Sequence, residues 1–254
     1  DKWNVDIVGG DTTSSFTGLA ISITCIGEAD AKDIVYRNGA HETDLICVSG
    51  DLGAAYMGLQ LLEREKSVYY QQIDTINKKI QKANAEGNDA LVKHLQEEGM
   101  KITDFQPDFA GREYLIQRQL KPEARGDIIA LLKENNIHPT AMMDISDGLS
   151  SELLHICRQS HCGCRIYEKK IPIDYQTAVT AEELNMNVTT CAMNGGEDYE
   201  LLFTCPIGDH EKLNALEHKG IRQIGYITKK ELGTRLLSRD NKEFNITAQG
   251  WKAF

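Results

Sequence analysis

Three short segments place small or glycine residues beside carboxylates, each directly after a run of apolar residues. They are residues 8–13, 143–148 and 194–199. Glycine has no Cβ, so a Gly-Gly pair lets the backbone take positive φ, approach a ligand closely and turn its N–H groups toward a phosphate oxygen. A neighbouring carboxylate can hold Mg²⁺, which prefers oxygen ligands and keeps some of its waters. The residue types therefore indicate a Mg²⁺-dependent phosphate site.

Two of the three segments also have a simpler interpretation. Asp144 and Asp147 are three residues apart at an expected strand-to-helix junction, so both can face one metal cluster. Ser146 or Asp147 can instead cap the helix that follows. Residues 9–11, Gly-Gly-Asp, can form an ordinary tight turn. Spacing alone leaves these alternatives open.

Several familiar catalytic motifs are absent from the sequence. It contains no G-x-x-x-x-G-K-[ST] loop, no G-x-G-x-x-G, no H-E-x-x-H and no G-x-S-x-G. Its seven histidines show no metal-ligand spacing. A phosphate site in this chain must therefore work without a P-loop.

Composition and charge exclude several classes of protein. The 254 residues are 41% hydrophobic, enough for one large domain or two small ones with a sizeable core. Lys+Arg at 28 against Asp+Glu at 38 gives a net charge of −10, opposite in sign to a typical nucleic-acid binder. No apolar run reaches the length of a membrane span. We therefore expect neither a nucleic acid nor a membrane as partner.

The cysteines give no sign of a disulfide framework or a zinc site. There are seven, an odd number, and the pair Cys162 and Cys164 has no second pair at zinc-finger spacing. We expect reduced, mostly buried thiols in a cytoplasmic protein.

Strand-like and helix-like segments alternate along the chain, which predicts an α/β layered fold. β-branched and apolar runs of strand length predict strands at 6–8, 19–26, 45–49, 141–143 and 199–205. Apolar residues at helical spacing predict helices after residue 53, at 127–135 and at 149–159.

The segment 63–99 differs in composition, being charged and rich in Gln and Asn. Apolar residues recur in it at spacings of three and four, interrupted near Gly87. This pattern predicts a helical hairpin. Such a hairpin either docks on its own domain or binds a partner as a short coiled coil.

The three acidic segments, extended to 7–13, 143–150 and 194–201, resemble those of the thiamine-monophosphate kinase family. This family belongs to the aminoimidazole ribonucleotide synthetase superfamily, and weaker matches lie at 36–40, 120–125 and 250–254. The resemblance implies that 1–38 are the last strands of an amino-terminal ATP-binding and dimerisation domain. It assigns 39–254 to the carboxyl-terminal domain, with 63–99 as an unusually long insert, and it implies that the family's upstream part is missing here.

The resemblance also implies a reaction and its residues. The γ-phosphate of ATP would pass directly, in line, onto thiamine monophosphate, with several Mg²⁺ ions and in a homodimeric full-length protein. A phosphate nucleophile is already largely ionised near neutral pH, so no side chain is expected as acid or base. The implied metal ligands are Asp11, Asp144 and Asp147; the ATP contacts are Gly10, Asp11, Arg37 and Ser146; the substrate contacts are Glu197 and Trp251.

Two other functions stay open on the sequence. The chain can be a non-catalytic nucleotide-binding remnant without the family's upstream acids. It can also be another ATP-dependent member of the same superfamily, although the G-G-E-D-Y-E and D-I-S-D-G segments favour the thiamine enzyme.

Overall fold

A computed structural model describes residues 5–16, 18–102 and 107–248, and the chain divides into two compact units, 1–34 and 35–254. In the first unit the described residues form one short 3₁₀ helix, η1 (Ala31–Asp33). The assignment of this unit to an ATP-binding domain stays a prediction.

The strands expected at 6–8 and 19–26 were predicted wrongly. Neither range is a strand, and the side chains of Ile7 and Ile23 are 97% and 81% exposed. A strand exists through the hydrogen bonds of its backbone to a neighbour, and within the described part of the chain these segments have no such neighbour. β-branched composition alone was therefore an insufficient signal.

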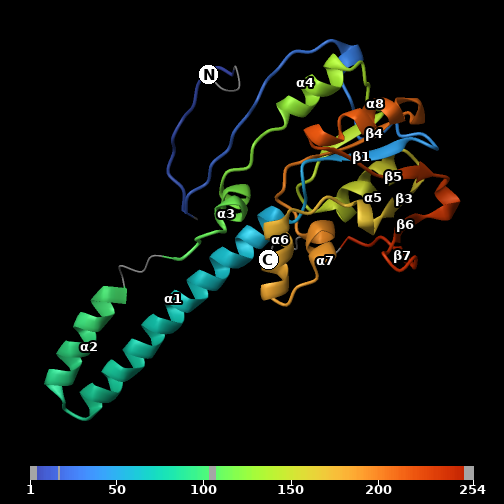
Figure 1. Cartoon of the computed structure of the whole chain (residues 1–254). Coiled ribbons are helices and arrows are strands. Elements are labelled where there is room, and N and C mark those ends of the chain that lie inside the picture. Colours follow the sequence, from blue (N-terminus) through green and yellow to red (C-terminus); the bar gives the residue numbers. More distant parts are fainter. Residues whose placement is uncertain (1–4, 17, 103–106, 249–254) are drawn as a thin grey trace. The chain divides into compact units, whose positions relative to one another are not determined.

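The second unit is built on one seven-stranded sheet with helices packed around it (Figure 1). Its strand order is β2-β4-β1-β5-β3-β6-β7, and β3 with β6 is the parallel pair among antiparallel neighbours. The strands are β1 (Leu45–Ser49), β2 (Ala141–Asp144), β3 (Gly163–Tyr167), β4 (Leu201–Cys205), β5 (Ile221–Thr228), β6 (Thr234–Leu237) and β7 (Glu243–Asn245).

Helices lie between most of the strands of this unit along the chain. The α-helices are α1 (Ala54–Ala85), α2 (Asp89–Ile102), α3 (Glu113–Leu120), α4 (Gly126–Glu134), α5 (Leu149–Gln159), α6 (Tyr175–Glu183), α7 (Val188–Asn194) and α8 (His210–Ala215). The 3₁₀ helices are η2 (Glu168–Lys170), η3 (Ile207–Asp209), η4 (Glu217–Lys219) and η5 (Lys230–Leu232). The predicted α/β class is confirmed.

Both faces of the sheet are covered, so its central strands are buried on both sides. In β1, Ile46 and Val48 belong to the core that contains the apolar side of α5. Leu45 and Cys47, which point to the opposite face, belong to the core formed with α4 and α8. A third cluster joins the start of α1 to α3, α6 and α7.

The helical hairpin expected over 63–99 is present as α1 and α2. The break lies at Gly87, which has a φ of 68°. Ile76 of α1 packs against Gly99 of α2, and Leu95 of α2 is buried. Since α1 begins inside the third apolar cluster, the hairpin is anchored on its own unit through α1.

Five of the seven cysteines are buried, which confirms the expectation of mostly buried thiols. Among the described residues, no helix combines the length and the apolar character needed to span a membrane.

We expect Leu95→Ala to release α2 from α1 without disturbing the sheet. Removing a buried leucine side chain costs about 2–5 kcal/mol. Amide hydrogen exchange over 89–102 should accelerate, while exchange in β1 and β4 stays slow. Leu91→Ala, at a residue that is 39% exposed, is the matched control and should change little. Equal effects of the two substitutions would contradict this packing.

Candidate functional site

The two acidic turns of the second unit lie side by side at one edge of the sheet. β2 and β4 are antiparallel neighbours, and their pairing continues beyond both strands. The Ile145 N–H donates to the Glu200 carbonyl at 2.8 Å, and the Tyr199 N–H donates to the Ile145 carbonyl at 2.9 Å. The Glu197 N–H then donates to the Ser146 carbonyl at 2.8 Å. Segments about 50 residues apart in the sequence thereby form one surface.

Two glycines make this close approach possible. Gly148 has a φ of 108°, and a Cβ there would lie 2.8 Å from the Asn194 Cα. Gly196 has a φ of 69°, and a Cβ there would lie 2.5 Å from the Ser146 carbonyl oxygen. Any other residue would combine an unfavourable backbone conformation with a clash against main-chain atoms.

Four polar side chains share this surface. Asp144 and Asp147 are exposed, and their carboxylates have no ion pair or side-chain hydrogen bond with any residue that the structure describes. Glu197 accepts a hydrogen bond from the Tyr199 hydroxyl at 3.1 Å. Burial, followed by the charges of Glu197, Asp144 and Asp147, raises the pKa of Tyr199. The three carboxylates therefore act on one tyrosine from two different turns.

Glu197 and Tyr199 also hold unusual backbone conformations, with φ of 62° and 50°. Non-glycine residues rarely adopt positive φ, and such strain concentrates at functional sites.

The helix after the first turn is not capped as the alternative interpretation required. The N-cap residue of α5 is Gly148, and no side chain caps it. Ser146 and Asp147 are therefore not capping residues. Instead Glu152 of the first turn of α5 reaches back, and its Oε1 accepts a hydrogen bond from the Asp147 N–H at 3.2 Å.

Glu152 itself is 1% exposed, and its Oε2 has no hydrogen-bond partner among the described residues. Burial raises the pKa of Glu152 to about 7, and the nearby charges of Asp147 and Asp144 add to the effect.

The donor set of the two turns fits Mg²⁺ in chemistry and in number. It consists of oxygen atoms, and proteins commonly hold Mg²⁺ through one or two carboxylates plus substrate phosphates. Over the described ranges, no three His, Cys, Asp or Glu side chains meet closely enough to hold a metal ion by themselves. Asp144 and Asp147 thus supply two carboxylates, the number that a site completed by phosphate oxygens needs.

The other residues predicted for the site are placed as follows. Asp11 and Gly10 belong to the first unit, where Asp11 Oδ1 accepts a hydrogen bond from the Thr12 N–H at 2.8 Å. Gly10 does not take the positive φ expected of it. Arg37 is exposed in the segment before β1, and Trp251 lies outside the described residues.

The segment that carries Arg37 runs beside β2. The Met142 N–H donates to the Tyr36 carbonyl at 2.9 Å. This bond attaches the residue before Arg37 to the same strand that ends in Asp144.

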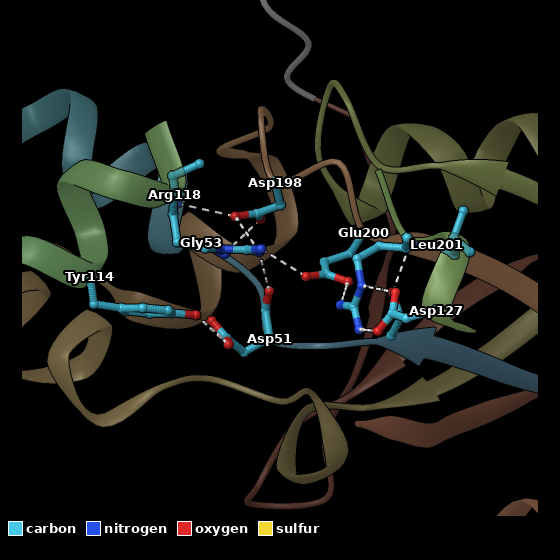
Figure 2. A network of polar contacts seen from close by, with 11 residues as sticks. Asp51, Gly53, Tyr114, Arg118, Asp127, Asp198, Glu200 and Leu201 are labelled. Carbon is cyan, nitrogen blue, oxygen red and sulfur yellow. Dashed lines mark hydrogen bonds and ion pairs between the residues drawn. The ribbon is translucent and has the colours of Figure 1, made fainter. Parts of the chain in front are cut away.

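Beneath the surface, two arginines and a serine converge on the buried carboxylate of Glu200 (Figure 2). Arg118 Nη1 donates to Glu200 Oε1 at 2.8 Å. Arg125 Nη1 and Ser49 Oγ both donate to Oε2. Ser49 Oγ in turn accepts the Leu201 N–H at 2.8 Å. This network ties α3, the start of α4, the end of β1 and the start of β4 to one acid.

Asp198, two residues earlier, is the second buried anchor of the same segment. It accepts hydrogen bonds from the Gly53 N–H at 2.7 Å and the Ala55 N–H at 3.2 Å, at the start of α1. Arg118 lies 3.6 Å from it. Burial raises the pKa of Asp198 to about 7, against the opposing effect of these three partners.

A further polar contact extends the network toward α3. The Tyr114 hydroxyl donates to Asp51 Oδ2 at 2.6 Å, and Arg118 Nη2 donates to the Asp51 carbonyl at 3.0 Å. Burial raises the pKa of Asp51 as well. The guanidinium of Arg118 therefore contacts Asp51, Asp198 and Glu200 at once and links these three parts of the chain.

These buried anchors were not predicted from the sequence. Asp198 and Glu200 alternate with Glu197 and Tyr199 directly before an apolar strand. Side chains at every second position of an extended segment share one face, and carboxylates on a buried face require basic partners. The alternation of residues 197–200 could have indicated two buried acids, but it does not identify the arginines that pair with them.

We expect Arg118→Gln to destabilise the second unit strongly. The substitution leaves Glu200 and Asp198 with one cation fewer in a buried setting, and breaking a buried ion pair costs about 3–5 kcal/mol. Arg112→Gln, which removes an exposed pair with Glu183, should cost about 1 kcal/mol or less. Chemical denaturation measures both free energies of unfolding. Similar values for the two variants would contradict the assignment of Glu200 as the anchor.

The raised pKa of Asp198 predicts a pH-dependent stability. Its folded-state pKa of about 7 exceeds the ordinary value of 3.8, so the folded state binds a proton more tightly than the unfolded state. This contribution is complete below pH 3.8 and is lost as the pH rises through 7. The free energy of unfolding of the parent, relative to Asp198→Asn, should therefore fall from about pH 5 to about pH 8, by roughly 1.4 kcal/mol per pH unit at most. If the free energy of unfolding of the parent, relative to Asp198→Asn, instead rises with pH, this explanation is wrong.

The chain is similar in sequence and in fold to known proteins. The family model described as "AIR synthase related protein, C-terminal domain" matches residues 85–236. Thiamine-monophosphate kinase of Buchnera aphidicola subsp. Schizaphis graminum is 32% identical over 247 residues, covering 95% of this chain and 62% of that protein. The enzyme of the same name from Bacillus subtilis is 27% identical, with 99% and 65% covered.

A solved structure described as AaThiL complexed with AMPPCP and TMP has a TM-score of 0.60 and 27% identity, covering 87% of this chain and 54% of that one. The chain thus spans a little over six tenths of the length of the curated relatives it matches. With the family model covering more than half of its residues, the chain belongs to the AIR synthase related proteins and carries their C-terminal domain.

Proposed function

We propose that this chain serves in the ATP-dependent phosphorylation of thiamine monophosphate to thiamine diphosphate. The observation that carries the proposal is the hydrogen-bonded junction of two acidic turns, which presents Asp144, Asp147 and Glu197 on one surface. Relatives named thiamine-monophosphate kinase support it, as does a similar structure bound to TMP and to AMPPCP, an ATP analogue.

The proposed roles follow the chemistry of each residue. Asp144 and Asp147 would hold Mg²⁺, and Ser146 between them would contact ATP. Arg37 would bring positive charge to the nucleotide phosphates. Glu197 would meet the cationic thiazolium ring of the substrate. The resemblance alone supports Asp11 as a metal ligand and ATP contact, Gly10 as an ATP contact and Trp251 as a substrate contact.

The reaction proposed needs charge compensation more than a proton acceptor. The attacking group is a phosphate oxygen that is largely ionised near neutral pH. When bound, Mg²⁺ supplies positive charge that offsets the repulsion between the two phosphate groups. The protein's role would be to fix its carboxylates and Arg37 so that the phosphates of ATP and of thiamine monophosphate are held in line. A rigid turn pair anchored on buried ion pairs suits this positioning role.

The alternative proposal is nucleotide binding without phosphoryl transfer. A cation held by Asp144 and Asp147 could bind nucleotide phosphates without any transfer to a second substrate. The two proposals differ in one observable, the release of ADP that depends on thiamine monophosphate.

We expect ADP release from ATP and Mg²⁺ to require thiamine monophosphate and to fall about 100-fold or more in Asp144→Asn and in Asp147→Asn. Losing one group that stabilises transition-state charge typically has an effect of this size. Asp240→Asn, which changes an exposed acid in the turn between β6 and β7, is the control and should keep full activity. Thiamine without phosphate should not serve as substrate.

Two results would overturn the kinase proposal. One is ADP release that is independent of thiamine monophosphate. The other is nucleotide binding that depends on Asp144 and Asp147 with no turnover at all, which would favour the alternative.

A further inference from the structure

Glu152 is a buried acid with one satisfied and one free oxygen. Its Oε1 accepts the Asp147 N–H at 3.2 Å and so holds the turn that carries Asp144 and Asp147. Its Oε2 is buried and has no hydrogen-bond donor among the residues that the structure describes. Leaving a buried acceptor unsatisfied costs about 1–3 kcal/mol, so such an atom calls for an explanation.

The surroundings of Glu152 narrow the kind of donor that can satisfy Oε2. Asp147 and Asp144 are close enough for their charges to act on Glu152, and neither ionised carboxylate can donate a hydrogen bond. No lysine or arginine pairs with Glu152 in the described ranges. No described residue donates to Oε2, so the donor can come from a species bound beside the carboxylates of Asp144 and Asp147.

A hydrated divalent cation has the required chemistry. Mg²⁺ dehydrates reluctantly and keeps several waters when one or two carboxylates bind it. Those waters are strong donors, and outer carboxylates that accept their hydrogen bonds orient the metal's ligands. Direct ligation by all three acids does not fit, since no three such side chains meet closely enough within the described residues.

We propose that Glu152 is a positioning residue for the cation: Oε1 fixes the backbone at Asp147, and Oε2 accepts a hydrogen bond from a water in the cation's hydration shell. The inference rests on the proposed function, because it takes Asp144 and Asp147 as the residues that ligate the ion. It assigns a role to a side chain outside the acidic motifs, with a separate task for each of its two carboxylate oxygens.

Two substitutions separate the two oxygens. Glu152→Gln keeps a carbonyl oxygen for the Asp147 N–H but replaces the free acceptor with an amide that donates. Glu152→Ala removes both. The probe is Mn²⁺ alone, titrated into the whole chain and followed by calorimetry, with amide hydrogen exchange at Asp147 measured without metal. Glu211→Gln, at an exposed position in α8, controls for the loss of one negative charge.

We expect Glu152→Gln to weaken Mn²⁺ binding about 10-fold or more, the size typical of an outer-shell partner, with Asp147 exchange unchanged. Glu152→Ala should weaken binding and also accelerate that exchange, while Glu211→Gln should bind as the parent does. If Glu152→Gln binds Mn²⁺ as tightly as the parent while Asp147→Asn does not bind, the inference is wrong and the metal assignment stands. If the parent chain does not bind Mn²⁺, both are wrong.

Discussion

Two guanidinium groups on one buried carboxylate hold the candidate site together. Arg118 and Arg125 approach Glu200 from α3 and from the start of α4, and Ser49 adds a third donor at the end of β1. A buried carboxylate is tolerated when its oxygens are paired, so Glu200 favours the arrangement in which α3, the start of α4 and the end of β1 close around it. That arrangement places the start of β4 beside the end of β2 and so brings the two acidic turns together.

Alternate residues of the segment 197–200 face opposite sides and have different roles. Asp198 and Glu200 point inward, one onto the first N–H groups of α1 and the other onto the arginines. Glu197 and Tyr199 are left on the outer surface, both with positive φ. The conformational cost of two such residues, of order 1–3 kcal/mol each, is offset by the buried polar contacts on the other side. The unfavourable backbone conformations therefore lie at Glu197, which is proposed to meet substrate, and at Tyr199, while the stabilising contacts are made by the adjacent Asp198 and Glu200.

The outer residues of the site could be predicted from the sequence, whereas the inner ones could not. Gly-rich acidic turns have a recognisable composition, so residue types and spacing pointed to Asp144 and Asp147 with helix capping as an open alternative, whereas Glu197 was selected by the family resemblance. The helix over 149–159 followed from its apolar spacing in the same way. Glu152 and Arg118 could not be found, because the pairing of a buried charge depends on which distant elements pack around it. The strands expected at 6–8 and 19–26 were wrong for a related reason, since a strand is defined by a neighbour that local composition does not specify.

The central claim is that two turns, distant in the sequence, form one cation-binding surface. Nuclear magnetic resonance with substoichiometric Mn²⁺ tests it most directly, because the paramagnetic ion broadens the signals of amides close to it. The account predicts that the amides of 144–148 and of 196–199 broaden together, at the same Mn²⁺ concentration, while those of β6 and β7 stay sharp. Broadening confined to one of the two turns, or centred on another part of the chain, would contradict it.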